Sequence, residues 1–312
     1  MAVDTEETAS AGQASEPPKS QSQGMSERTL ARAFMAPSVT AMVLVAGFPI
    51  IWAVFLSLWA YQGRERTGFA GLGNYVEAAT DPRFWDSVLA TFVFTIGSVF
   101  FEFIIGMVFA LIMNKAFFGR GVTRAAILIP WVIPTVISAQ MWFFMFNITP
   151  GFINSVLPFV PADFNWLGTD YWAMFAVIFA DVWKTSPFVA LLLLAGLQTI
   201  PGELYEAGRV DGASAWQQFR NITLPLLRPA ILVALLFRTV DALRIYDLPA
   251  VMTNGAFGTE TLSVLVQQFV VQTPDPGLGS AFSTLTFAIV LGIGIVFIAA
   301  LGRDLVIGAE EE

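Results

Sequence analysis

The stretch PGELYEAGRVDGASAWQQFRNITLPLLRP, residues 201–229, is the longest polar interruption between two strongly apolar segments of the chain. Its residue pattern predicts ordered structure rather than a slack loop. Glu203 and Glu206 favour a helix N-terminus, where carboxylates interact well with the helix dipole. Asp211 and Gly212 then end the run, because this pair is typical of turns. The first half of the stretch is therefore expected to form one short helix.

A second short helix is expected directly after this turn. Ser214 is followed three residues later by Gln217, which is the spacing of a capping box, and the apolar positions continue as far as Ile222. Pro225 stands where the next apolar segment begins. Two amphipathic helices at a membrane surface either lie on lipid or offer a face to a soluble partner, and the residue pattern alone leaves both alternatives open.

The composition predicts an all-α integral membrane protein. The 312 residues are 56% hydrophobic and 13% charged, with a mean hydropathy of +0.68 and a net charge of −8. Cysteine and histidine are both absent, which excludes disulfides, thiol nucleophiles, the usual zinc sites and histidine acid–base chemistry. The sequence also has no Walker nucleotide-binding loop. We therefore expect a protein that is not an enzyme and that binds no cofactor of its own.

The apolar runs predict six membrane-spanning helices within a domain covering residues 27–307. Residues 1–26 have almost nothing to bury and are expected to be disordered, and 308–312 form an acidic tail. Residues 62–85 are expected to be an exposed loop, 249–279 a long connection without lysine or arginine, and 201–223 the paired short helices. The expected spans are 37–61, 86–113, 125–146, 171–197, 225–247 and 280–301.

The distribution of lysine and arginine predicts the orientation of these spans, because cytoplasmic loops carry an excess of both. With six spans, only three of the basic residues considered fall on one side: Arg64, Arg66 and Arg83. The opposite side holds Arg28, Arg32, Lys115, Arg120, Arg124, Arg209, Arg220, Arg228 and Arg303. Both termini and the paired short helices are therefore expected in the cytoplasm.

Several ionisable residues lie within or near the expected spans, where charge is costly. Insertion of a charge at the bilayer centre costs about 2.5–3.5 kcal/mol, so such residues usually face a cavity or a partner. Two sets recur at intervals of three, which places each set close to one helix face. They are Asp181 with Lys184, and Arg238 with Asp241 and Arg244. Counting along each span puts Lys184, Arg238 and Asp241 near the same depth.

Two hypotheses account for these charges. In the first, they neutralise one another and hold helices together; Glu102 is expected to pair in this way, with a partner that the sequence does not identify. In the second, they line a polar translocation path together with Trp142, Trp183 and Tyr246. Polar groups beside aromatic rings suit a sugar, which has hydroxyl groups and an apolar ring face.

The central stretch resembles the EAA signature of the membrane subunits of bacterial ABC importers. The matching positions are Glu206, Ala207, Gly208, Asp211, Gly212, Ala213, Phe219, Ile222, Leu224 and Pro225. In that family this segment is the coupling helix, which docks into a cleft on the ATPase subunit. The resemblance assigns ATPase coupling to the first six of these residues. Gly208 replaces an alanine of the family pattern, which is expected to loosen the first helix slightly.

Three further stretches resemble the carbohydrate branch of these importers, typified by maltose and glycerol-phosphate permeases: 129–142, 181–201 and 237–255. With the central stretch, the resemblance covers most of residues 30–305. Residues 237–247 resemble actinobacterial trehalose permeases, whereas 254–257 depart from the usual run of glycines. The resemblance implies the type I permease fold, with six transmembrane helices, in a bacterial cell membrane.

The same resemblance implies a function and partners. It implies import of a sugar, such as the disaccharides trehalose or maltose, by alternating access. It also implies a second, similar permease, an extracytoplasmic sugar-binding protein, and a pair of cytoplasmic ATPases that carry the ATP and Mg. On this reading the substrate path uses Lys184, Arg238, Asp241, Arg244, Trp183 and Tyr246.

Two other classes of membrane protein fit the sequence less well. An ion-coupled secondary transporter would use the buried carboxylates, but such transporters often contain inverted internal repeats, and none is evident here. A membrane enzyme would need a nucleophile with a base, or a metal site, and the sequence offers neither constellation.

The orientation can be tested by cysteine labelling, because the natural chain contributes no background thiol. A cysteine introduced at Asn114 is expected to react with a membrane-impermeant maleimide only after the cells are opened. A cysteine introduced at Arg64 provides the matched control and is expected to react in intact cells. Labelling of Asn114→Cys from outside would contradict the six-span orientation.

Overall fold

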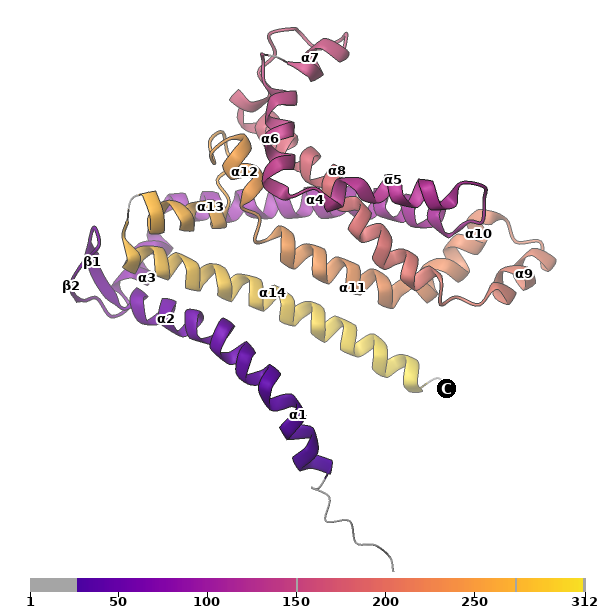
Figure 1. Ribbon diagram of the computed structural model, residues 1–312, viewed down its shortest axis with the longest axis horizontal. Helices are drawn as coiled ribbons and strands as arrows, with labels where there is room; N and C mark the ends of the chain where they lie inside the picture. The colour runs from indigo at the N-terminus through magenta and orange to yellow at the C-terminus, as the bar shows by residue number, and fades with distance from the viewer. Residues whose placement is uncertain (1–26, 150, 273, 311–312) are drawn as a thin grey trace, which may run out of the picture. The chain divides into compact units, whose positions relative to one another are not determined.

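Figure 1 shows a computed structural model of the chain, which describes residues 27–149, 151–272 and 274–310. Helices dominate these residues, so the predicted all-α architecture is confirmed apart from one two-stranded hairpin. The predicted tail 1–26 lies outside the described residues, as do the last two residues of the acidic tail.

The first elements are α1 (Glu27–Met42), η1 (Val43–Gly47), α2 (Phe48–Ser57), β1 (Trp59–Gln62), β2 (Glu65–Phe69), α3 (Gly73–Thr80), α4 (Pro82–Asn114), α5 (Arg120–Val132), α6 (Thr135–Phe146), α7 (Phe152–Val156) and η2 (Trp166–Gly168). The remainder are α8 (Asp170–Leu197), α9 (Gly202–Val210), α10 (Ala215–Gln218), η3 (Phe219–Thr223), α11 (Leu224–Ala242), α12 (Asp247–Met252), α13 (Leu262–Gln267), η4 (Gln268–Gln272) and α14 (Pro276–Glu310).

The chain divides into two compact units, Met1–Pro49 and Ile50–Glu312. The described part of the first unit is helical throughout, and its side chains are almost all exposed. This exposed helix continues to Ser57, so the apolar run Arg28–Ser57 is long enough to cross a membrane.

The predicted first span, 37–61, ends too late. The helix stops at Ser57, and β1 pairs with β2 in an antiparallel hairpin. The amide of Asn74 in α3 donates to the carbonyl oxygens of Ser57 and Trp59, at 2.8 and 2.9 Å. Residues 62–85, expected to be an exposed loop, therefore contain β2 and α3 and are tied to the end of α2.

The structure does not confirm the expected number of six spans. By length and composition, four single helices among the described residues can cross a membrane, namely Arg28–Ser57, Pro82–Asn114, Asp170–Leu197 and Pro276–Ala299. The pair α5 and α6 makes up to a fifth. Helix α11, at the position of the predicted span 225–247, is only 19 residues long and carries Arg228, Arg238 and Asp241. The six-span count is therefore not confirmed.

The predicted third span, 125–146, is broken. Helices α5 and α6 meet at an angle of 90° across Ile133 and Pro134. Proline has no N–H to donate and disfavours helical geometry in the residue before it, and both residues adopt extended ψ values. The break thus follows directly from the local sequence.

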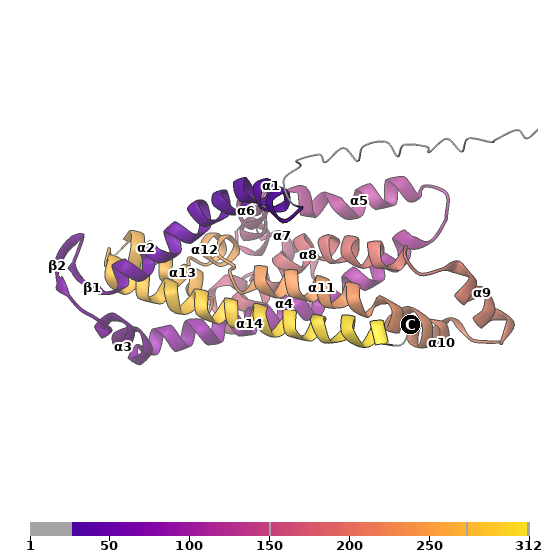
Figure 2. The same ribbon diagram turned by 90° about the horizontal axis from the view of Figure 1, so that it is seen from below.

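Helices α4 and α8 form the most extensive helix pair, and α11 packs against both (Figures 1 and 2). Gly106 of α4 permits a close approach, because a Cβ there would lie 2.7 Å from Val189 Cγ1 of α8. On the other side of α8, Gly196 leaves no room for a side chain against Ala230 of α11. These small residues let the three backbones pack closely, as is common between membrane helices.

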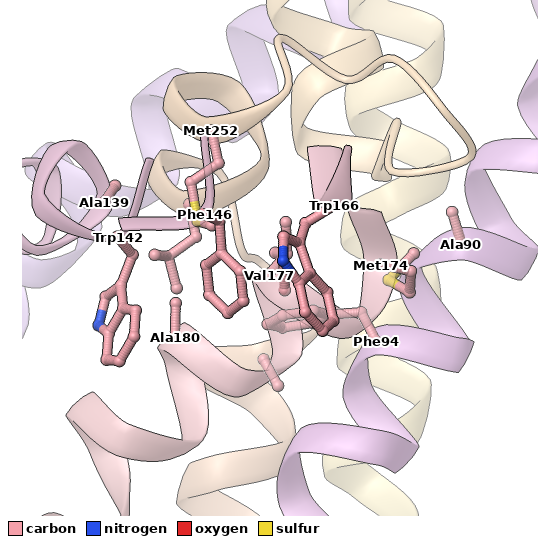
Figure 3. Close-up of a cluster of buried hydrophobic side chains, with 13 residues drawn as sticks. Ala90, Phe94, Ala139, Trp142, Phe146, Trp166, Met174, Val177, Ala180 and Met252 are labelled. Carbon is pink, nitrogen blue, oxygen red and sulfur yellow. The ribbon is translucent and has the colours of Figure 1, made fainter. Parts of the chain in front are cut away.

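An aromatic cluster holds α6 against α8 beyond the break (Figure 3). Trp142 and Phe146 of α6 contact Phe179 of α8, with ring centroids 5.2 and 6.0 Å apart. Phe146 also meets Trp166, whose Nε1 donates to the side-chain oxygen of Asn154 at 2.6 Å. The described part of the connection between α6 and α8 is therefore anchored to the core.

Candidate functional site

The paired short helices predicted at 201–223 are joined by a well-defined turn after α9. Gly212 has φ +79°, a left-handed conformation that glycine adopts without strain. Its N–H donates to the carbonyl of Arg209 at 3.1 Å, and the N–H of Ala213 donates to the carbonyl of Gly208 at 2.8 Å. These two bonds form a Schellman motif, which satisfies the last carbonyls of α9.

The capping box predicted at Ser214 and Gln217 is confirmed, but the helix that it opens does not end as expected. α10 continues through the π-helical segment η3 into α11, and Gln218, Phe219, Thr223 and Leu224 all keep right-handed helical angles. The second short helix is therefore the first part of one helical run from Ala215 to Ala242. Proline at the start of α11 is compatible with this because the widened π turn precedes it.

Side-chain contacts fasten α9 to the start of this run. Tyr205 Oη lies 3.0 Å from Thr223 Oγ1, and the amide of Gln218 donates to the carbonyl of Ala213 at 3.0 Å. Gly208 faces the same contact, since a Cβ there would lie 3.2 Å from Ile222 Cδ1. The glycine in place of the family's alanine thus lets α9 approach η3 closely.

The six residues assigned to ATPase coupling divide into two groups. Gly208 and Ala213 are half-buried against the second helix, whereas the other four are exposed: Glu206, Ala207, Asp211 and Gly212. Two large apolar side chains that the sequence analysis did not assign are also exposed beside them, Val210 at 88% and Trp216 at 67%. We call Glu206, Ala207, Val210, Asp211, Gly212 and Trp216 the coupling surface.

A buried ion-pair cluster joins three helices at Arg238 of α11. Its guanidinium donates through Nε and Nη2 to both oxygens of Glu102 in α4, and through Nη2 to Asp181 in α8. Its Nη1 donates to Asp241 at 2.6 Å. Arg238, Glu102 and Asp181 are at most 2% exposed, whereas the side chain of Asp241 is 76% exposed.

The cluster identifies the partner of Glu102, which the sequence analysis could not name. Thr185 of α8 also donates to Glu102, at 2.5 Å, so this carboxylate is held from two helices. The first hypothesis, in which charges pair between helices, describes the contact of Arg238 with Asp181. With four hydrogen bonds to carboxylates, Arg238 has nearly all its donors engaged in this conformation.

Lys184 of α8, a second buried cation, lies at the break between α5 and α6. Its Nζ donates to the carbonyl of Trp131 at 3.5 Å. The last four carbonyls of a helix have no partner within it, and a cation is favourable near them. On α6, Ser138 Oγ and Trp142 Nε1 are buried and have no hydrogen-bond partner among the described residues. Their spacing of four residues puts both on one face of α6.

The remaining predicted path residues are more exposed. Trp183 is half-buried, with its ring 5.4 Å from that of Trp142. Arg244 and Tyr246 are exposed and follow α11, which ends at Ala242. The expectation that Arg244 shares a helix face with Arg238 and Asp241 is therefore wrong, because the helix ends first.

A groove of about 1440 Å³ lies between α4, α5 and α8. Its lining is mostly apolar and includes Phe101, Ile105, Phe179 and Trp183, but none of the charged residues of the cluster. A groove of this kind offers a sugar few hydrogen-bonding groups.

Comparison with known proteins relates this architecture to membrane transport. Residues 102–305 match the family model described as "Binding-protein-dependent transport system inner membrane component". The chain is 44% identical over 279 residues to the "Trehalose/maltose transport system permease protein MalF" of Thermococcus litoralis, covering 87% of this chain and 93% of the relative. It is 40% identical over 280 residues to the "Trehalose transport system permease protein SugA" of Mycobacterium tuberculosis, covering 89% and 90%. In fold it is similar to a crystallised bacterial ABC transporter involved in the import of alginate, with a TM-score of 0.74, 20% identity, and coverage of 88% and 96%.

The buried carboxylate Glu102 and the exposed carboxylate Asp241, which both bind Arg238, are expected to differ in how much they stabilise the fold. Glu102→Ala leaves a buried guanidinium with fewer partners and should lower the free energy of unfolding by about 3–5 kcal/mol. Asp241→Ala removes an exposed partner of the same guanidinium and should cost about 0–1 kcal/mol. The unfolding midpoints of the purified chain in detergent measure both effects. Equal midpoints for the two variants would contradict the assignment of a buried cluster.

Proposed function

The chain belongs to the family of binding-protein-dependent transport system inner membrane components, and on that basis we propose that it is the membrane-spanning permease subunit of an ATP-driven sugar importer. It is a transport component and not an enzyme. The observation that carries the proposal is the coupling surface, an exposed patch at one end of a helix that runs to the buried charges. Trehalose and maltose are the proposed sugars, since they appear in the names of relatives at 40–44% identity.

The proposed assembly contains this chain, a second permease, a pair of ATPases and an extracytoplasmic sugar-binding protein. ATP and Mg would bind to the ATPases, because the present sequence has no Walker loop. The charge distribution supports cytoplasmic termini and a cytoplasmic coupling surface in a bacterial inner membrane. On this orientation the coupling surface meets the ATPases directly.

The proposed sugar path passes the break between α5 and α6. Irregular backbone at membrane depth is tolerated where protein covers it or where it lines a water-filled cavity. Lys184, Ser138 and Trp142 place polar groups near this break, and Trp183 adds an aromatic face. Asp241, Arg244 and Tyr246 would contact the sugar from the end of α11, where their side chains are exposed.

Arg238 belongs to this proposed path only indirectly. In the present conformation its donors are engaged by carboxylates and its side chain is buried, so it would hold Asp241 in place rather than contact a sugar. The alternative of an ion-coupled secondary transporter is not favoured, because the family consists of components that depend on a binding protein.

The coupling role can be tested with Glu206→Lys. Reversing the charge of Glu206 should disrupt docking of the ATPase, because a cation would then stand where the contact is formed around a carboxylate. Sugar uptake and ATP hydrolysis stimulated by the binding protein should both fall by at least about tenfold in cells that insert the variant normally. Glu77→Lys makes the same charge change at an exposed position of α3 and should have little effect. Wild-type uptake by the Glu206→Lys variant would rule out the proposed docking face.

The sugar path can be tested with Asp241→Asn and labelled trehalose and maltose. Loss of a charged hydrogen-bond acceptor for the sugar should weaken transport by about tenfold or more, while stimulation of the ATPase by the binding protein persists. Asp163→Asn, at an exposed position between α7 and η2, is the matched control. If assembled Asp241→Asn complexes import both sugars with unchanged rate and apparent affinity, Asp241 does not contact the sugar.

A further inference from the structure

A single helical run connects the coupling surface to the buried ion pairs. It begins at Ala215, next to the exposed turn at Gly212, and continues through η3 and α11 to Ala242. At 1.5 Å per residue, Arg238 lies roughly 35 Å along this run from Ala215. The same element therefore has one end at the surface proposed to meet the ATPase and the other at the charge cluster.

The part of this run that is weakest in backbone hydrogen bonds is braced from outside. The π turn of η3 widens the helix, and Pro225 and Pro229 each lack an N–H that would bond to the preceding turn. Beside this part, Tyr205 of α9 contacts Thr223, and Gln218 of α10 donates to the carbonyl of Ala213 in the turn between α9 and α10. The brace lets α9, α10 and η3 move as one body instead of bending separately.

The far end of the run is fastened to two other helices at once. The planar fork of Arg238 holds both oxygens of Glu102 on α4 and one oxygen of Asp181 on α8. Because α4 and α8 pack closely through Gly106, they form one body to which α11 is attached. The second close approach of α11 to α8, at Gly196 and Ala230, involves only apolar contact and does not fix a direction.

We propose, on the basis of the proposed importer function, that Arg238 is a positioning residue that transmits movement of the coupling surface to the α4–α8 pair. A guanidinium gripping two carboxylates resists both sliding and rotation of α11, which a single point charge would not do. Movement imposed at the coupling surface then displaces α8 with α11. α8 carries Lys184 and Trp183, so the displacement reaches the proposed sugar path.

The test compares sugar imported per ATP hydrolysed by the reconstituted importer in proteoliposomes, with labelled trehalose and maltose as probes. Arg238→Lys keeps the charge and removes the fork, and it should lower this ratio about fivefold while ATP hydrolysis continues, a size typical of weakened coupling. Asp181→Asn keeps the shape of the side chain and an acceptor oxygen but removes the negative charge, so it weakens one of the two ties and should lower the ratio less. Arg228→Lys makes the matched substitution at an exposed position of α11 and should leave the ratio unchanged.

The outcomes separate the inference from the function on which it rests. A merely structural role would reduce the amount of assembled complex but leave sugar imported per ATP unchanged, and that result for both variants would overturn the inference. If the complex that contains Arg238→Lys does not assemble, the sugar imported per ATP by the Asp181→Asn complex decides by the same criterion. Absence of ATP-dependent sugar import by the wild-type complex would overturn the proposed function, and the inference with it.

Discussion

The arrangement of the second unit depends on the burial of one guanidinium. A charge removed from water must find partners of opposite sign, and three helices supply them to Arg238. Glu102 and Asp181 come from segments that are far apart in the sequence, so satisfying this charge brings α4, α8 and α11 together at one level. Apolar packing around glycines then determines how closely the helices approach. The buried charge determines which helices meet. Apolar contacts alone would favour one pairing of helices little over another, because membrane lipid is as apolar as the helix faces.

The break between α5 and α6 shows a second case in which buried polar groups need partners. Ending α5 at Val132 leaves carbonyl groups without intrahelical partners, and Lys184 reaches one of them from α8. The proline at 134 thus breaks the helix, and the lysine at 184 of another apolar segment binds a carbonyl group near the break. The aromatic cluster around Trp142, Phe146 and Trp166 then holds α6 in its new direction. Together, the helix break and Lys184 place polar groups inside the bundle, and the aromatic cluster packs beside them.

Much of this architecture could be predicted from the sequence, and the misses have physical causes. Composition was sufficient for the all-α membrane class, and the spacing of Ser214 and Gln217 was sufficient for the capping box. The break at Pro134 was missed because apolar periodicity continues on both sides of it, so hydropathy alone merges two helices. The end of the first span was misplaced because Trp59 and Tyr61 are as apolar as helix residues, although they form a strand.

The charged residues were identified individually, but their pairing depends on three-dimensional helix contacts that one sequence does not contain. Arg244 illustrates the same limit, because its spacing of three from Asp241 has no meaning beyond the helix end.

The continuous helix from Ala215 to Ala242 also limits how this region can change during evolution. Each residue of a helix adds about 100° of rotation, so loss or gain of one residue between Leu224 and Arg238 would turn the guanidinium away from its carboxylates. Loops absorb insertions and deletions easily, but this segment has no loop in which to absorb them. The π turn at Phe219–Thr223 is itself the geometry that a single inserted residue produces in a helix. Lineages of this chain should therefore vary freely in the length of the connections outside the membrane while keeping a constant number of residues from Leu224 to Arg238.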